Sequence, residues 1–140
     1  MMRFFLKACL ALAFLGVAVG VFVWNFLPGI ASGVLISLNN ASAGLSAKTI
    51  ETDIGPIHYL EGGKGETVLL VHGIYARKEH WVDVARELVP DYHVIAIDLP
   101  GFGDNTILVD EEYDLSNQSQ NLTMVIEALE LDRFHLAANS

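Results

Sequence analysis

The chain has 140 residues, of which 52% are hydrophobic, and its net charge is −9 at pH 7. This length allows one modest domain, and the mean hydropathy of +0.41 is high for a soluble protein. The acidic balance excludes the basic surface that neutralises nucleic-acid phosphates, so we expect no nucleic-acid partner.

The apolar residues are concentrated near the N-terminus. No charged residue or histidine occurs from Ala8 to Ala47, and only Asn25 interrupts the apolar segment Ala8–Phe26. A helix needs about 20 such residues to cross the roughly 30 Å hydrocarbon layer of a bilayer, and Pro28-Gly29 is expected to stop this one. The pattern therefore divides the chain into a transmembrane anchor at residues 1–27, a linker at residues 28–47 and a folded domain at residues 48–140.

The charges on either side of the anchor predict its orientation. Arg3 and Lys7 are the charged residues that precede the apolar segment, and all 17 acidic residues follow it. Because positive residues stay on the cytoplasmic side, we expect a cytoplasmic N-terminus and an extracytoplasmic domain, periplasmic if the protein is bacterial. A cleaved signal peptide is the alternative, but its best cleavage match, Ala41-Ser42-Ala43, lies far beyond the apolar segment. We therefore expect a single-pass anchor that is not removed.

Strand-like and helix-like segments alternate after Lys48. The segment KTIETDIGPIHYLEGG predicts two strands around Gly55-Pro56, and TVLLVHG predicts a strand buried on both faces. A helix that ends before Pro90 follows. Its predicted apolar face is formed by Trp81, Val84, Ala85 and Leu88.

Two further buried strands are predicted in YHVIAIDLPG and FHLAANS, with the helix NLTMVIEALEL between them. We expect Asp114 or Ser116 to cap this helix. Its predicted apolar stripe consists of Leu122, Val125, Ile126 and Leu129. Strands and helices that alternate with short loops predict an α/β fold with a parallel sheet and right-handed crossovers.

The predicted functional site lies where these strands end. In open parallel sheets, ligands bind beyond the carboxyl ends of the strands. Those ends are His72-Gly73-Ile74, Asp98-Leu99-Pro100-Gly101 and Asn139-Ser140.

Three motifs in this order resemble the first half of an α/β-hydrolase: VLLVHGIYARKEHW, VIAIDLPGFGDN and FHLAANS. The chain most resembles the branch of membrane-anchored monoacylglycerol lipases and bacterial lipases. The resemblance implies the N-terminal half of an α/β-hydrolase fold, a mostly parallel sheet with flanking helices, preceded by the transmembrane helix. It also implies that the chain is a fragment that ends at the nucleophile.

The same resemblance implies the site residues. Ser140 stands at the nucleophile of the family's G-x-S-x-G turn, with Ala138 in place of the first glycine. The N–H of Ile74 is expected to donate to the oxyanion, and Gly73 lets the backbone approach the substrate. His72 is interpreted as a structural hydrogen-bonding residue of this loop, because the family's catalytic acid and histidine follow the serine. We expect no metal and no cofactor.

A serine-dependent carboxylic ester hydrolase that acts on acylglycerols or similar lipid esters is the main prediction. Its partners would be the lipid or ester substrate and the membrane, and the sequence does not predict an oligomeric state. Carbon–carbon bond hydrolases are the enzymatic alternative, since they share a small residue, Asn and Ser at this turn. Epoxide hydrolases and haloalkane dehalogenases are disfavoured, because they have aspartate where Ser140 stands. A membrane-tethered binding protein without catalytic activity is the third hypothesis.

Overall fold

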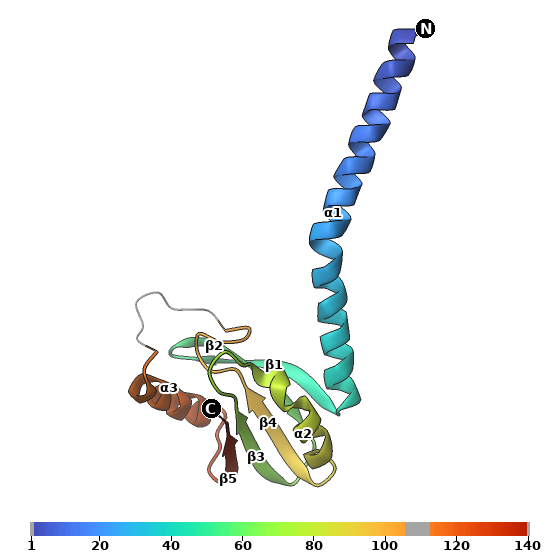
Figure 1. The fold of residues 1–140 in the computed structure, drawn as a ribbon. Helices are drawn as coiled ribbons and strands as arrows, with labels where there is room; N and C mark the ends of the chain where they lie inside the picture. The colour runs from blue at the N-terminus through green and yellow to red at the C-terminus, as the bar shows by residue number, and fades with distance from the viewer. Residues whose placement is uncertain (1, 106–112, 140) are drawn as a thin grey trace. The chain divides into compact units, whose positions relative to one another are not determined.

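The computed structural model describes residues 2–105 and 113–139, and it divides the chain into two compact units, Met1–Ile36 and Ser37–Ser140. The second unit holds a five-stranded sheet with helices on it (Figure 1). Ser140, the predicted nucleophile, lies outside the described residues.

The first element is the helix α1, Met2–Ser42. The predicted stop at Pro28-Gly29 is wrong, because the helix continues through Pro28. A proline removes one N–H donor from the helix, and this is tolerated in apolar helices where local side chains satisfy nearby backbone groups. Two polar side chains of α1 do bond back to it: Asn25 Nδ2 donates to the Val21 carbonyl at 2.7 Å, and Ser32 Oγ donates to the Gly29 carbonyl at 2.9 Å. Within the described residues, one helix (Leu12–Ser42 of α1) is long and apolar enough to cross a membrane.

The predicted linker at residues 28–47 is also not an irregular segment. It is helical up to Ser42, and the strand β1, Leu45–Thr52, begins soon afterwards. Ala43 and Leu45 are both 4% exposed and belong to the core of the second unit. Arg86 donates to Ser42 Oγ at 3.0 Å and to Asn39 Oδ1 at 3.1 Å, so the last turn of α1 is bonded to the folded unit.

The sheet has the order β1-β2-β4-β3-β5. The two strands predicted around Gly55-Pro56 are present as β1 and β2 (Gly55–Gly62). They form an antiparallel pair, and β2 also pairs antiparallel with β4 (Tyr92–Ile97). The strands β4, β3 (Glu66–Val71) and β5 (Phe134–Ala138) are parallel, as the alternation of strands and helices predicted. The carboxyl ends of three neighbouring strands therefore meet at one edge of the sheet.

Successive residues of the strands pack on opposite faces of the sheet, because side chains alternate along a strand. One face packs against η1, Lys78–Trp81, and α2, Val82–Leu88, through the core residues Leu60, Val68, Leu70, Val94, Ala96, Val82 and Ala85. The other face packs against α3, Leu115–Ala128, through Ile57, Leu69, Val71, Ile95, Ile97 and Val125.

Two predictions about packing need correction. Val84 is 46% exposed, and Val82 is the buried residue instead, because the segment before Val82 is a 3₁₀ helix with fewer residues per turn than the predicted α-helix. The strand β5 is not a buried strand in the described chain. It pairs with β3 alone among the described strands, and its Leu136 is 54% exposed.

The prediction for α3 is confirmed. Asp114 caps the helix, with its carboxylate accepting the N–H of Asn117 at 2.7 Å. The predicted stripe packs on the sheet through Leu122, Val125, Ile126 and Leu129.

Because Leu45 is a core residue, we expect Leu45→Ala to lower the free energy of unfolding of the complete protein by about 2–4 kcal/mol. Ala47→Ser, at an exposed position of the same strand, is the matched control and should change it by about 0.5 kcal/mol or less. Denaturant unfolding measures both. Equal effects would show that the folded unit begins after β1 starts, at Lys48.

Candidate functional site

A pocket of about 270 Å³ lies at the carboxyl ends of the parallel strands. All three residues of the predicted oxyanion loop line it, together with residues that follow β4, precede or begin α3, and follow β5. The lining residues are His72, Gly73, Ile74, Leu99, Phe102, Tyr113, Leu115, Gln118 and Asn139. The chain thus brings the described members of the predicted site to one hollow of the surface.

His72 is 2% exposed, and both of its ring nitrogens have partners. The backbone N–H of Leu99 donates to Nε2 at 3.0 Å, and Nδ1 lies 2.8 Å from the Gly73 carbonyl oxygen. A nitrogen that accepts an N–H carries no proton, so this arrangement fixes the neutral ring with the proton on Nδ1. Since neither nitrogen is free to take a proton from a substrate or a serine, the geometry suits the structural role predicted for His72.

The peptide group between Gly73 and Ile74 is held through its carbonyl. The Gly73 oxygen accepts from His72 Nδ1 and from the N–H of Ala76 at 3.2 Å. The carbonyl and the N–H of a planar trans peptide point in opposite directions, so the N–H of Ile74 is directed away from the His72 ring. Among the described residues, no hydrogen bond involves this N–H. Ile74 therefore presents a fixed backbone donor beside the pocket.

Asn139 connects this loop to the end of β5. Its Oδ1 accepts the N–H of Gly73 at 2.8 Å, and its own N–H donates to the Val71 carbonyl at 3.3 Å. The two neighbouring N–H donors of the loop thus differ, because that of Gly73 is hydrogen-bonded while that of Ile74 has no partner in the part of the chain that the structure describes. The sequence predicted Asn139 only as part of this turn. No sequence pattern indicated that its side chain binds the N–H of Gly73.

The next residue of the loop, Tyr75, has a backbone φ of +57° and is 91% exposed. A side chain in this left-handed region strains the backbone, and such strain is concentrated at functional sites. The exposed Ile74 lines the pocket, and Phe102, which also lines it, packs its ring edge-on against His72 with 5.7 Å between ring centres. The pocket is accordingly apolar on much of its wall, which suits an apolar ligand.

Asp98, which follows β4, is 0% exposed. One carboxylate oxygen accepts the N–H of Lys78 at 2.7 Å, and the other accepts the N–H of Asp104 at 2.9 Å. Gly103 lies against this carboxylate with φ +59°, and a Cβ there would come within 2.1 Å of the Asp98 carboxyl carbon. These bonds hold the loop after β4 on the carboxylate of Asp98.

Lys78 is the residue of this region that sequence reasoning missed. It is 2% exposed, and its Nζ donates to Asp98 Oδ2 at 2.7 Å and to Asp104 Oδ2 at 2.5 Å. Burial by itself lowers the pKa of Lys78, but the hydrogen bonds to Asp104 and Asp98 outweigh burial and raise this pKa above its ordinary value. The hydrogen bond from Lys78 likewise lowers the pKa of Asp104. No sequence signal distinguishes Lys78, since a lysine at the start of a helix is normally solvated.

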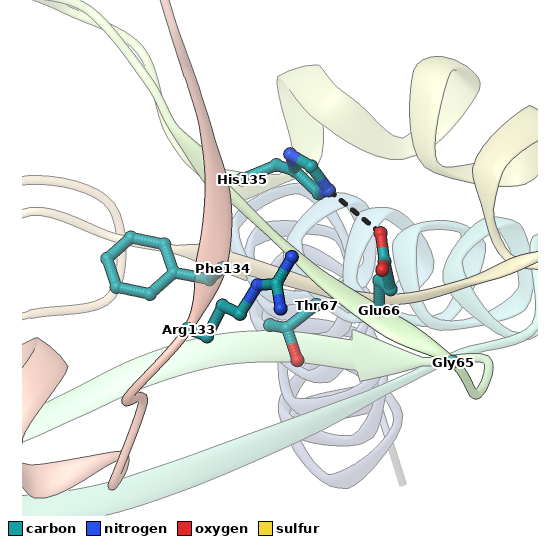
Figure 2. A pocket seen from close by; sticks show the side chains of 6 residues that line it. All are labelled: Gly65, Glu66, Thr67, Arg133, Phe134 and His135. Carbon is teal, nitrogen blue, oxygen red and sulfur yellow. Dashed lines mark hydrogen bonds and ion pairs between the residues drawn. The ribbon is translucent and has the colours of Figure 1, made fainter.

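A second pocket, of about 300 Å³, lies at the opposite ends of the same strands, between the starts of β3 and β5 (Figure 2). Figure 2 shows the ring of His135 directed toward Glu66, with Arg133 nearby. His135 Nε2 lies 3.1 Å from Glu66 Oε2. The hydrogen bond from His135 and the charge of Arg133 lower the pKa of Glu66. Both partners of the pair are largely exposed, so the pair contributes little to stability. Of the predicted site residues that the structure describes, none lines this pocket.

Comparison with known proteins agrees with this geometry. A family model described as the alpha/beta hydrolase fold matches residues 66–140, more than half of the chain. A 2-hydroxy-6-oxo-6-phenylhexa-2,4-dienoate hydrolase of Comamonas testosteroni is 33% identical over 113 residues, which are 76% of this chain and 39% of that protein. Monoacylglycerol lipase abhd6-A of Xenopus laevis is 29% identical over 80 residues, 56% of this chain and 24% of the lipase.

A solved structure gives the same result. The crystal structure of a membrane phospholipase A, a bacterial virulence factor, matches with a TM-score of 0.82 at 38% identity and covers 100% of this chain and 44% of the phospholipase. The chain therefore spans less than half the length of each of these relatives. The motifs, the three parallel strands that end at one pocket and the family match together show that this chain belongs to the α/β-hydrolase family.

Proposed function

We propose that the complete protein is a serine-dependent carboxylic ester hydrolase that acts on lipid esters. The observation that supports this most directly is the N–H of Ile74, which has no partner among the described residues and is held by the bonds of His72 and Asn139. Hydrolysis of an ester puts negative charge on the carbonyl oxygen, and a fixed donor at that place lowers the barrier. The chain spans less than half of its relatives, so the activity is proposed for the whole protein.

In this proposal, Ser140 is the nucleophile. Its hydroxyl attacks the ester carbonyl and forms an acyl-enzyme with release of the alcohol, and water then releases the acid. Ser140 directly follows Asn139 in the sequence, and the side chain of Asn139 binds the loop that carries Ile74, which supports a common role for Ser140 and this loop. A general base and an orienting acid are also required, and the family resemblance implies that they follow Ser140 in the sequence.

The lipid character of the substrate is supported by three observations. The pocket is lined largely by apolar and aromatic residues, and α1 includes a candidate membrane span. Two of the relatives are a monoacylglycerol lipase and a membrane phospholipase A. A lipid ester partitions into membranes, where an anchored hydrolase would meet it.

Carbon–carbon bond hydrolysis is the second candidate. The relative from Comamonas testosteroni is a dienoate hydrolase, and Asn139 before Ser140 fits that group as well. Assays of the complete protein with monoacylglycerols, phospholipids and a 2-hydroxy-6-oxo-dienoate distinguish the two reactions, because the second consumes a coloured dienoate without any ester present.

The nucleophile prediction is tested by Ser140→Ala in the complete protein. We expect the rate of ester hydrolysis to fall by about 10³-fold or more, and labelling by a fluorophosphonate probe to disappear, because removal of a triad member costs several orders of magnitude. Ser116→Ala, a serine of α3, is the control and should be labelled like the wild type. Undiminished labelling of Ser140→Ala would assign the nucleophile to another residue.

Two substitutions of Asn139 are expected to rank in opposite orders for stability and for activity. Asn139→Ala removes the acceptor of the Gly73 N–H and should lower the free energy of unfolding by about 1 kcal/mol, whereas Asn139→Asp keeps an acceptor oxygen and should be close to wild type. For kcat we expect the reverse order, with Asp below Ala, because a carboxylate beside the oxyanion opposes its charge. Denaturant unfolding ranks the two variants by stability, and ester turnover ranks them by kcat. The same ranking in both measurements would contradict the placement of Asn139 beside the oxyanion.

The orientation in the membrane is also a proposal. Arg3 and Lys7 precede the apolar helix, so alkaline phosphatase fused after Ser140 in a bacterial host should be active, and a cytoplasmic reporter at the same point should be inactive. The opposite pair of results would reverse the orientation.

A further inference from the structure

The loop that carries Ile74 is attached at both of its ends to one short segment, Asp98-Leu99, that follows β4. At the first end, His72 accepts the N–H of Leu99 at 3.0 Å. At the second end, Lys78 donates to Asp98 from both its backbone N–H and its Nζ, each at 2.7 Å. The backbone between these ends, residues 73–77, contains the N–H of Ile74, which has no hydrogen-bond partner in residues 2–105 and 113–139.

The second attachment depends on a buried charge. Lys78 and Asp98 are 2% and 0% exposed, so each would be costly to bury alone. Their group also includes Asp104, which Lys78 binds at 2.5 Å, and Glu79, whose Oε1 lies 3.3 Å from Nζ. Arg77 bonds to Glu79 and Asp104 at 2.5 and 3.0 Å. The loop after β3 and the loop after β4 are thus joined by a continuous set of charged hydrogen bonds.

A buried ion pair of this kind is not explained by stability, since well-packed apolar residues often stabilise a fold as well or better. A pair of apolar side chains in its place would bury the same area, but apolar contacts would not fix the orientation of the loop end. Three donor–acceptor bonds from one ammonium group and its own N–H fix both the distance and the orientation of the loop end relative to β4.

We propose that Lys78 is a positioning residue, which sets the direction of the Ile74 N–H by holding the second end of its loop on Asp98. This inference rests on the proposed function, in which that N–H stabilises the oxyanion. Lys78 lies at the start of η1 and not among the residues that line the pocket, so it acts through the loop and not on the substrate. Small misplacements of a catalytic group lower the rate steeply, by about 10²-fold for 1 Å.

The test uses the complete protein with three variants. Lys78→Met alone leaves Asp98 buried without its cation, so the pair variant Lys78→Met/Asp98→Asn removes both charges together and is the main one. Asp104→Asn is a milder change, because this side chain is 49% exposed and supplies one of the acceptors of Lys78. Lys48→Met is the matched control, since it removes a lysine from an ion pair with Glu61 on β1 and β2, outside the loop.

We expect the pair variant to fold and to lose about 10-fold or more in kcat with KM changed less than 2-fold, because only transition-state stabilisation is affected. Asp104→Asn should lose kcat in the same direction by a smaller factor, and Lys48→Met should match the wild type. Hydrogen–deuterium exchange should become faster at Gly73 and Ala76, whose N–H groups are bonded in the loop, in both loop variants.

The outcomes separate the two proposals. A wild type with no ester hydrolysis refutes the proposed function, and the exchange at Gly73 and Ala76 then decides whether Lys78 holds the loop. Faster exchange with an unchanged kcat shows a purely structural role and overturns the positioning proposal. Unchanged exchange in a folded pair variant, or in Asp104→Asn where the pair variant does not fold, overturns it as well.

Discussion

The buried carboxylate of Asp98 is the constraint on which the architecture of the site depends. A fully buried charge persists only when it is paired and hydrogen-bonded, and Asp98 meets this condition with donors from Lys78 and Asp104. The backbone of Asp98 is hydrogen-bonded too. Asn105 Nδ2 donates to its carbonyl at 2.8 Å, and its own N–H donates to the backbone carbonyl of His58 at 2.9 Å. Asp98, at the end of the central strand β4, therefore holds both the loop after β3 and the loop after β4.

This arrangement determines what the site can do before any substrate arrives. The bonds of His72, Lys78 and Asn139 hold the loop after β3 at three points. A donor that is already oriented requires no reorganisation during the reaction, which is the physical basis of oxyanion stabilisation. Both ring nitrogens of His72 have partners, which suits the structural role predicted for it although histidine is the commonest catalytic base. In the proposed function, chemistry and support are thus assigned to different atoms of adjacent residues.

Much of the fold follows from local patterns in the sequence. The apolar runs of β3 and β4 and the stripe of α3 are confirmed, as is the cap at Asp114. These features depend on residues close together in the chain, so periodicity and capping chemistry suffice to identify them. The α/β-hydrolase family was also recognisable, because its motifs occur in order at the strand ends. The end of α1 was not, because Pro28 predicts a break by its local chemistry while the residues around it continue the helix.

The sequence by itself determined the order of strands and helices after Lys48, that the strand ends carry the candidate chemistry, and that an apolar segment precedes the fold. Only the tertiary structure decided that Ala43 and Leu45 belong to the core and that Val82 is buried in place of Val84. It alone showed that the N–H of Gly73 is hydrogen-bonded while that of Ile74 has no partner among the described residues. Only the tertiary structure, likewise, placed Lys78 beside Asp98, 20 residues further along the chain. The physical reason is the same in each case: burial and hydrogen-bond partners depend on contacts between segments distant in sequence, which no local pattern of residue types specifies.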